Sequence, residues 1–129
     1  GYQAEVQRYF MSPVVDERDN RMTAEAAALM LVDLYSGKEL SSELRDFAVG
    51  CLRRQQYREK LPLLLPEDVP VGHKTGELDG VRHDAAVVEL ENPYVVVIFT
   101  EKGREPWLVD QAMAIRSRQI FDAMEGVLS

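Results

Sequence analysis

Apolar residues follow two different rhythms along the chain. From residue 23 to residue 56, and again from residue 106 to the end, they recur every three or four positions. Between residues 69 and 100 they come in short, valine-rich runs separated by Gly, Pro, Asn and Asp. The first rhythm is typical of helices, and the second is typical of strands joined by tight turns. The pattern therefore predicts two helices, three strands and a last helix.

Two helices are expected before the strands, and residues 1–22 are expected to be irregular or to form a short helix. Thr23 is the expected N-cap of the first helix and Gly37 its stop. This helix is apolar around most of its circumference, which predicts burial on most sides. Ser41 or Ser42 caps a second helix that runs to about residue 56. Its apolar stripe consists of Leu44, Phe47, Ala48, Cys51 and Leu52.

Three strands are expected at residues 69–76, 82–90 and 94–100, after a proline-bracketed apolar segment at 61–66. Their connections are too short for a crossover, so neighbouring strands must be antiparallel. The fold class is therefore α+β, an antiparallel three-strand meander with helices packed on it. The last helix covers about residues 106–127. Its expected inner face consists of Leu108, Ala112, Met113, Ile115, Ile120, Ala123, Met124 and Val127.

The third strand, 94–100, departs from the pattern of a strand with one wet face. It is continuously apolar, which is typical of a strand covered on both faces and central in its sheet. As the last strand of a meander it would lie at an edge, where unpaired backbone groups favour association. We expect its free side to pair with strands of an absent N-terminal part of the same domain, or with a second copy of the chain.

Composition narrows the class of protein. The 129 residues amount to one domain, and 46% of them are hydrophobic. The net charge of −7 argues against nucleic acid, which requires a basic surface. A single cysteine, Cys51, excludes an intrachain disulfide, and its helical context predicts a buried, inert thiol. No segment is long and apolar enough to span a bilayer, and no signal-peptide pattern precedes Gly1.

Residues 66–76 read Pro-Glu-Asp-Val-Pro-Val-Gly-His-Lys-Thr-Gly. A Lys-Thr-Gly tripeptide is common by chance, but here a proline-rich lead-in precedes it, and a hairpin, a strand at 84–88, an apolar strand and a helix follow it. This order resembles the Lys-Thr-Gly strand of penicillin-recognising serine enzymes, especially class A β-lactamases. The passages at 20–27 and 37–40 resemble the same family, so the resemblance extends from about Asp19 to the end of the chain.

The resemblance implies a role for five residues. Lys74 supplies a fixed positive charge that holds the substrate carboxylate and lowers the pKa of nearby hydroxyls, and the Thr75 hydroxyl binds the same carboxylate. Gly76 leaves room for the substrate, and Glu77 contributes its backbone N–H to the oxyanion hole. Arg82 either helps to bind the carboxylate or forms a cross-strand ion pair with Glu77, and the two alternatives carry equal weight.

Four other residues carry weaker expectations. His73 and His83 are expected in supporting or surface positions, because no His/Cys/Glu spacing indicates a metal site. Asp84 is expected to be a structural hydrogen-bonding residue, and Trp107 a packing residue. No cofactor is expected.

The chain also departs from the family pattern. No serine is followed by lysine three residues later, so the Ser-x-x-Lys nucleophile motif is absent, and so is Ser-Asp-Asn. Glu5 lies near the place of the family's deacylating glutamate, but Tyr9 stands where an asparagine belongs. We expect residues 1–129 to be the C-terminal part of one β-lactamase-like domain, inactive by itself because the N-terminal part with the nucleophile is absent.

Three functional hypotheses follow. The first is a β-lactamase-type serine hydrolase that acts on the β-lactam amide through an acyl-enzyme. The second is a penicillin-binding protein related to D-alanyl-D-alanine peptidases, and the third is a non-catalytic binding module with the same fold. The expected ligand is a β-lactam or a peptidoglycan-like small molecule. The resemblance implies a secreted or periplasmic protein.

Overall fold

The computed structural model describes residues 22–78 and 80–128 of the protein. Expectations for residues 1–21, including Glu5 and Tyr9, lie outside these described residues. The elements, in chain order, are α2 (Ala24–Ser36), α3 (Ser42–Arg53), β1 (Val71–Leu78), β2 (Val81–Val88), β3 (Tyr94–Thr100) and α4 (Pro106–Leu128). None of the described helices is long and apolar enough to cross a membrane.

The three strands form one antiparallel sheet in the order β1-β2-β3, which confirms the predicted α+β meander. β1 begins two residues later than predicted because the Val69 N–H donates to the Pro66 carbonyl in a turn (3.1 Å). Leu78 pairs with Val81 at the end of the first hairpin, and Gly80 in its turn has φ +71°, a left-handed conformation that suits glycine.

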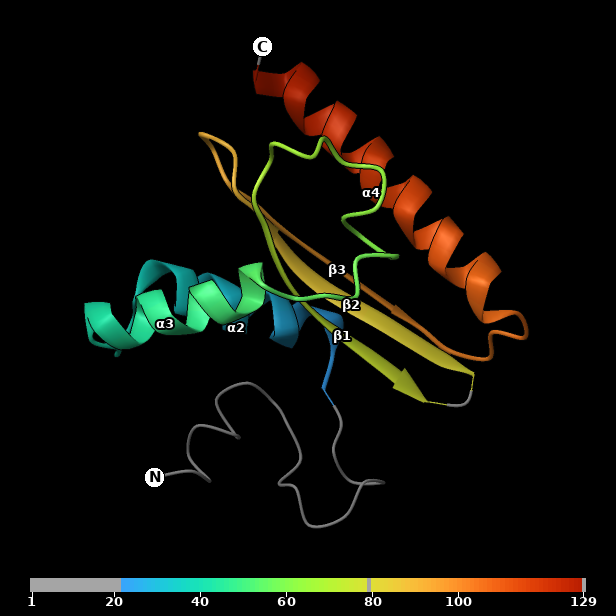
Figure 1. The fold of residues 1–129 in the computed structure, drawn as a ribbon, viewed down its shortest axis with the longest axis horizontal. Coiled ribbons are helices and arrows are strands. Elements are labelled where there is room, and N and C mark those ends of the chain that lie inside the picture. The colour runs from blue at the N-terminus through green and yellow to red at the C-terminus, as the bar shows by residue number, and fades with distance from the viewer. Residues whose placement is uncertain (1–21, 79, 129) are drawn as a thin grey trace.

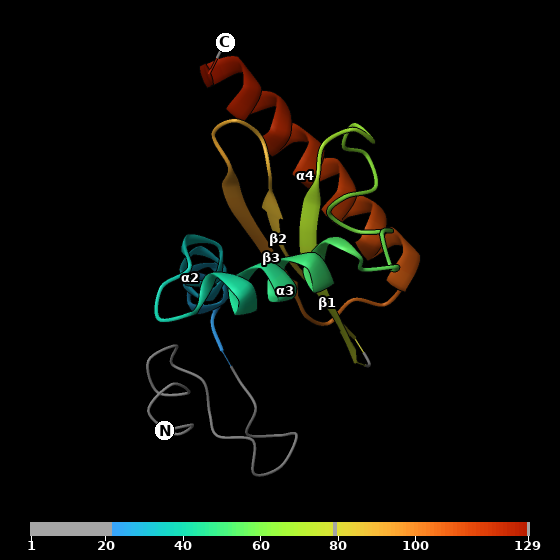
Figure 2. The same ribbon diagram turned by 60° about the vertical axis from the view of Figure 1, so that its left-hand side comes forward.

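The sheet lies between two helical layers, with α4 on one face and α2 and α3 on the other (Figures 1 and 2). The loop from residue 54 to residue 70 runs along the α4 side. Side chains alternate along β1, so Val71, His73 and Thr75 are buried on the α4 side while Lys74 is exposed. The core between sheet and α4 consists of Leu61, Leu65, Val71, Ala86, Val88, Val96 and Phe121.

Local signals located both ends of α2 and the start of α3 correctly. The Thr23 hydroxyl accepts from the Ala26 N–H (3.0 Å), and Gly37 ends α2 with φ +73°. The Ser41 hydroxyl caps α3 through the Leu44 N–H (3.2 Å). α3 ends at Arg53, earlier than predicted.

The predicted inner face of α3 is wrong in part. Val49 is its buried residue, Ala48 and Leu52 are half-buried, and the predicted Leu44, Phe47 and Cys51 are exposed. The helix packs on β1 through the side that carries Val49, because β1 presents Gly72, where Leu52 can approach closely. The expectation of a buried Cys51 is therefore wrong.

The inner face of α4 also differs from the prediction. Its buried residues recur at helical spacing and are Asp110, Met113, Ala114, Ser117 and Phe121. The predicted Leu108, Ala112, Ile115 and Ala123 are exposed, whereas Met113, Ile120 and Met124 do turn inward, and the side chain of Val127 is not among those described. Asp110 faces the sheet because it pairs with Arg82 on β2. Trp107 is 59% exposed, so it is not the packing residue expected.

Part of the apolar surface remains open in the described structure. β3 lies at a sheet edge, and within residues 22–78 and 80–128 no strand pairs with its outer side. On α2 the buried residues are Ala26, Ala27 and Leu31, but Leu29 and Val32 are about half exposed. The expectation that α2 is covered on most sides is therefore wrong for this part of the protein.

Candidate active site

The candidate residues on β1 project to both faces of the strand. Lys74 is exposed, and its ammonium group donates to the Thr75 carbonyl. Thr75 is buried on the opposite face, directly across from Asp84 on β2, and Glu77 lies across from Arg82. Thr75, Glu77, Arg82 and Asp84 therefore share one face of the sheet. The chain thus presents one exposed cation beside one buried hydroxyl.

The two glycines of β1 differ in what surrounds them. A Cβ at Gly72 would lie 2.0 Å from the Tyr35 hydroxyl oxygen and 3.3 Å from the Leu52 Cβ, so packing requires glycine there. A Cβ at Gly76 would meet only the His83 Cβ, at 3.8 Å. The space beside Gly76 is therefore open among the described residues, as the predicted approach of a substrate requires.

Glu77 is paired with a residue that the sequence analysis missed. Lys60, in the loop before β1, is only 2% exposed. Its ammonium group donates to the Glu77 carboxylate and to the His83 carbonyl (3.1 Å). The only hint in the sequence is that Lys60 directly precedes the apolar segment 61–66.

Arg82 is held by α4. Its Nε lies 2.5 Å from Asp110 Oδ1 and its Nη2 lies 2.8 Å from Asp110 Oδ2, a two-point contact. The hydrogen bond to Asp110 raises the pKa of Arg82 above its ordinary value. The alternative of a cross-strand ion pair with Glu77 is therefore wrong, because each partner pairs elsewhere. A role of Arg82 in binding a substrate carboxylate stays a prediction.

A fully buried His73–Asp84 pair lies behind the Lys-Thr-Gly segment. His73 Nδ1 lies 3.0 Å and 3.2 Å from the two carboxylate oxygens of Asp84. Asp84 also accepts from the Leu61 N–H (3.1 Å), so it joins β2 to β1 and to the preceding loop. Both residues act structurally here, as expected of Asp84. His73 Nε2 has no partner among the described residues.

His83 has a different environment. The Thr100 N–H donates to His83 Nδ1 (3.1 Å), and the ring lies 4.4 Å from that of Phe99. Burial lowers the pKa of His83 below its ordinary value of 6.5. The lowered pKa favours the neutral ring, and Nδ1 also lies 3.1 Å from the Arg82 carbonyl oxygen.

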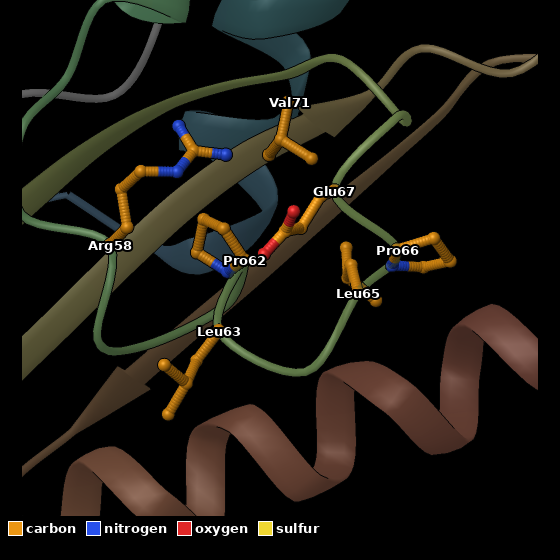
Figure 3. A pocket seen from close by; sticks show the side chains of 7 residues that line it. All are labelled: Arg58, Pro62, Leu63, Leu65, Pro66, Glu67 and Val71. Carbon is orange, nitrogen blue, oxygen red and sulfur yellow. The ribbon is translucent and has the colours of Figure 1, made fainter.

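A pocket of about 380 Å³ opens in the loop before β1. Figure 3 shows it lined by Arg58, Pro62, Leu63, Leu65, Pro66, Glu67 and Val71. None of the candidate residues from Lys74 to Arg82 lines this pocket. The residues proposed from the sequence therefore lie outside this pocket, on β1 and β2.

The described chain is an antiparallel sheet between helical layers, with Lys-Thr-Gly on one of its outer strands. The model of the β-lactamase enzyme family matches residues 1–124. The chain therefore belongs to the β-lactamase enzyme family, which confirms the resemblance inferred from the motif. No curated protein matches the chain.

Solved structures of this family share the fold. The extended-spectrum β-lactamase TLA-1 superposes with a TM-score of 0.83 at 17% identity, over 95% of this chain and 52% of its own. PBP-A, in a variant solved as an acyl-enzyme complex with penicillin G, gives 0.84 at 24% identity, over 96% and 50%. A β-lactamase from Sphaerobacter thermophilus gives 0.77 at 28% identity, over 87% and 44%. The chain spans about half the length of these proteins.

Proposed function

We propose that residues 1–129 are the C-terminal part of one β-lactamase-like domain, and that the complete protein is a serine hydrolase that opens the β-lactam amide through an acyl-enzyme. The observation that carries this proposal is the exposed Lys74 on the open side of β1, beside Thr75 and the unfilled space at Gly76, in a chain of the β-lactamase family.

The residues of β1 would act on a substrate that lies along the strand. Because Lys74 and Thr75 project to opposite faces, the carboxylate would lie at the outer edge of β1, with Lys74 on one side of it and the Thr75 hydroxyl on the other. Lys74 would also favour the deprotonated form of a nearby nucleophilic hydroxyl. The Glu77 N–H donates to the oxyanion that forms when the nucleophile attacks. Arg82, two-point bonded to Asp110, stabilises the hairpin and adds positive charge near the carboxylate.

The nucleophile itself would come from the other part of the domain, because no serine of residues 1–129 has a lysine three positions later. The outer edge of β3 and the exposed apolar side of α4, with Leu108 and Ile115, support a junction there. The alternative partner for the outer edge of β3 is a second copy of the chain. The family resemblance also supports a secreted or periplasmic protein.

A penicillin-binding function close to that of D-alanyl-D-alanine peptidases is the second candidate. It is favoured by the similarity to PBP-A, a variant of which was solved as an acyl-enzyme complex with penicillin G. Such a protein forms an acyl-enzyme with a β-lactam but hydrolyses that acyl-enzyme slowly. The two candidates therefore differ in the lifetime of the covalent adduct, which a time course of intact mass after mixing with penicillin measures.

The test of the proposal is the second-order rate constant, kcat/KM, of the complete protein with a chromogenic cephalosporin. Lys74→Ala should lower it by about 10²–10³-fold, the loss typical of one preorganised electrostatic group. Exposed Lys38→Ala is the matched control and should leave the rate unchanged. An unchanged rate for Lys74→Ala would make the motif a coincidence.

A further inference from the structure

Lys60 is a buried charged side chain to which the proposed mechanism assigns no task. It is 2% exposed, and its described partners are the Glu77 carboxylate and the His83 carbonyl. A buried ammonium group is costly unless it is paired and hydrogen-bonded. Glu77 itself has a side chain that is 42% exposed, so the pair joins a buried cation to a carboxylate that reaches the surface.

The negative charge of Glu77 lies close to the proposed site for a substrate carboxylate. Glu77 is on the same face of β1 as Thr75, two residues further along the strand, which corresponds to roughly 7 Å. An anionic group of a substrate bound by Lys74 and Thr75 would meet the field of Glu77 at short range. A carboxylate at this position therefore opposes the binding of an anion unless a cation offsets it.

The nearby charges show which cation offsets Glu77. Arg82 lies opposite Glu77 and interacts with its charge, but its guanidinium group is bonded at two points to Asp110, and exposed Glu59 also acts on it. Within the described residues Lys60 is the cation that contacts Glu77. With Lys60–Glu77 and Arg82–Asp110 paired, Lys74 is the cation of this site that has no carboxylate partner among the described residues, and the paired Arg82 adds to its field.

We propose that Lys60 is a specificity-determining residue: by neutralising Glu77 it makes the Lys74–Thr75 site selective for substrates that carry a carboxylate. This rests on the proposed function of β1. Lys60 acts on the substrate through Glu77 and is a positioning residue, since its ammonium group is buried behind the strand. It also joins the loop before β1 to the His83 carbonyl, which keeps the Glu77 carboxylate in a fixed place.

The experiment compares a penicillin with its uncharged methyl ester in the complete protein, by the ratio of the two acylation rate constants. Lys60→Met should lower the acid-to-ester ratio by about two- to tenfold, because Glu77 then repels the carboxylate. Glu77→Gln should raise the ratio, since Lys60 is then unopposed. The double variant should return the ratio close to that of the wild type, and Lys60→Arg should preserve it.

The outcomes separate this inference from the function on which it rests. A ratio unchanged in Lys60→Met, or equal losses for acid and ester, would reduce Lys60 to a packing residue and overturn the inference. If Lys60→Met does not fold, Glu77→Gln decides alone, and a ratio that does not rise rejects the inference. A wild-type protein acylated by neither compound refutes the proposed function itself, and the inference with it.

Discussion

Gly72 is a single position at which one added carbon should disturb two elements. The Tyr35 hydroxyl that a Cβ would meet donates to Glu89 (3.4 Å), and burial raises the pKa of Tyr35 to about 12, so it remains a donor. Gly72→Ala should lower the free energy of unfolding by about 1–3 kcal/mol, the usual cost of overpacking. Urea unfolding of the protein measures it. Gly76→Ala, with open space, is the control and should change stability far less.

His83 predicts a pH dependence of stability. Its folded-state pKa lies below its ordinary 6.5 because of burial, so the unfolded chain binds the proton more readily. The contribution of neutral His83 to the free energy of unfolding is fully present above pH 6.5. It is lost as the pH falls through 6.5 towards the pKa of His83 in the folded protein. His83→Gln should therefore lose less stability than the wild type between pH 7 and pH 5.5. Equal slopes of the urea midpoint against pH would contradict this assignment.

Single residues differ in how far the sequence reveals them. Lys74, Thr75 and Gly76 could be found because they are contiguous and stand in a familiar order of elements. Lys60 could not, because its burial depends on how a 17-residue stretch of chain folds back on the hairpin to bring it to Glu77. The partner of Arg82 was equally hidden, since Asp110 lies 28 residues away on α4.

The contact between Arg82 and Asp110 is the clearest charged link between the sheet and α4. Removing either partner leaves the other partly buried and unpaired. Arg82→Ala and Asp110→Ala should each destabilise the protein, and the double variant should lose less than their sum. A double-mutant cycle by urea unfolding should give a coupling of about 0.5–3 kcal/mol. Strict additivity would mean that the contact contributes nothing measurable.

The sequence predicted the positions of the helices and strands better than it predicted which side of each helix is buried. The caps at Thr23 and Ser41 and the strand Tyr94–Thr100 depend on local chemistry, which a sequence carries directly. The inner faces of α3 and α4 were wrong in part because apolar residues lie on more than one side of each helix. The buried side depends on contacts with β1 and β2, such as the Arg82–Asp110 pair, which local sequence does not show.

At the scale of the molecule, the open edge of β3 predicts association. The strand is apolar, lies at the edge of the sheet, and is accompanied by exposed Leu29, Val32, Leu108 and Ile115. Residues 1–129 produced alone should therefore dimerise or aggregate rather than stay monomeric. Light scattering measures this, with mass spectrometry to exclude a co-purifying fragment. A soluble monomer at high concentration with cooperative unfolding would contradict the idea of a missing partner for this edge.

The family could be inferred from the sequence because its order of elements is preserved over the whole described chain. The active site could be inferred only in part, since β1 presents one wall of it and the remaining groups belong to chain outside residues 1–129 under our proposal. An antiparallel sheet does not indicate by itself what covers its outer strand, so the partner of β3 could not be predicted from these elements alone.

The most direct test is the intact mass of the protein after incubation with penicillin G. We expect the complete protein to gain the mass of one β-lactam, on a serine outside residues 1–129, and the chain of residues 1–129 alone to gain none. Lys74→Ala should slow the gain in the complete protein. An adduct on a serine within residues 1–129, or no adduct on the complete protein, would contradict the account.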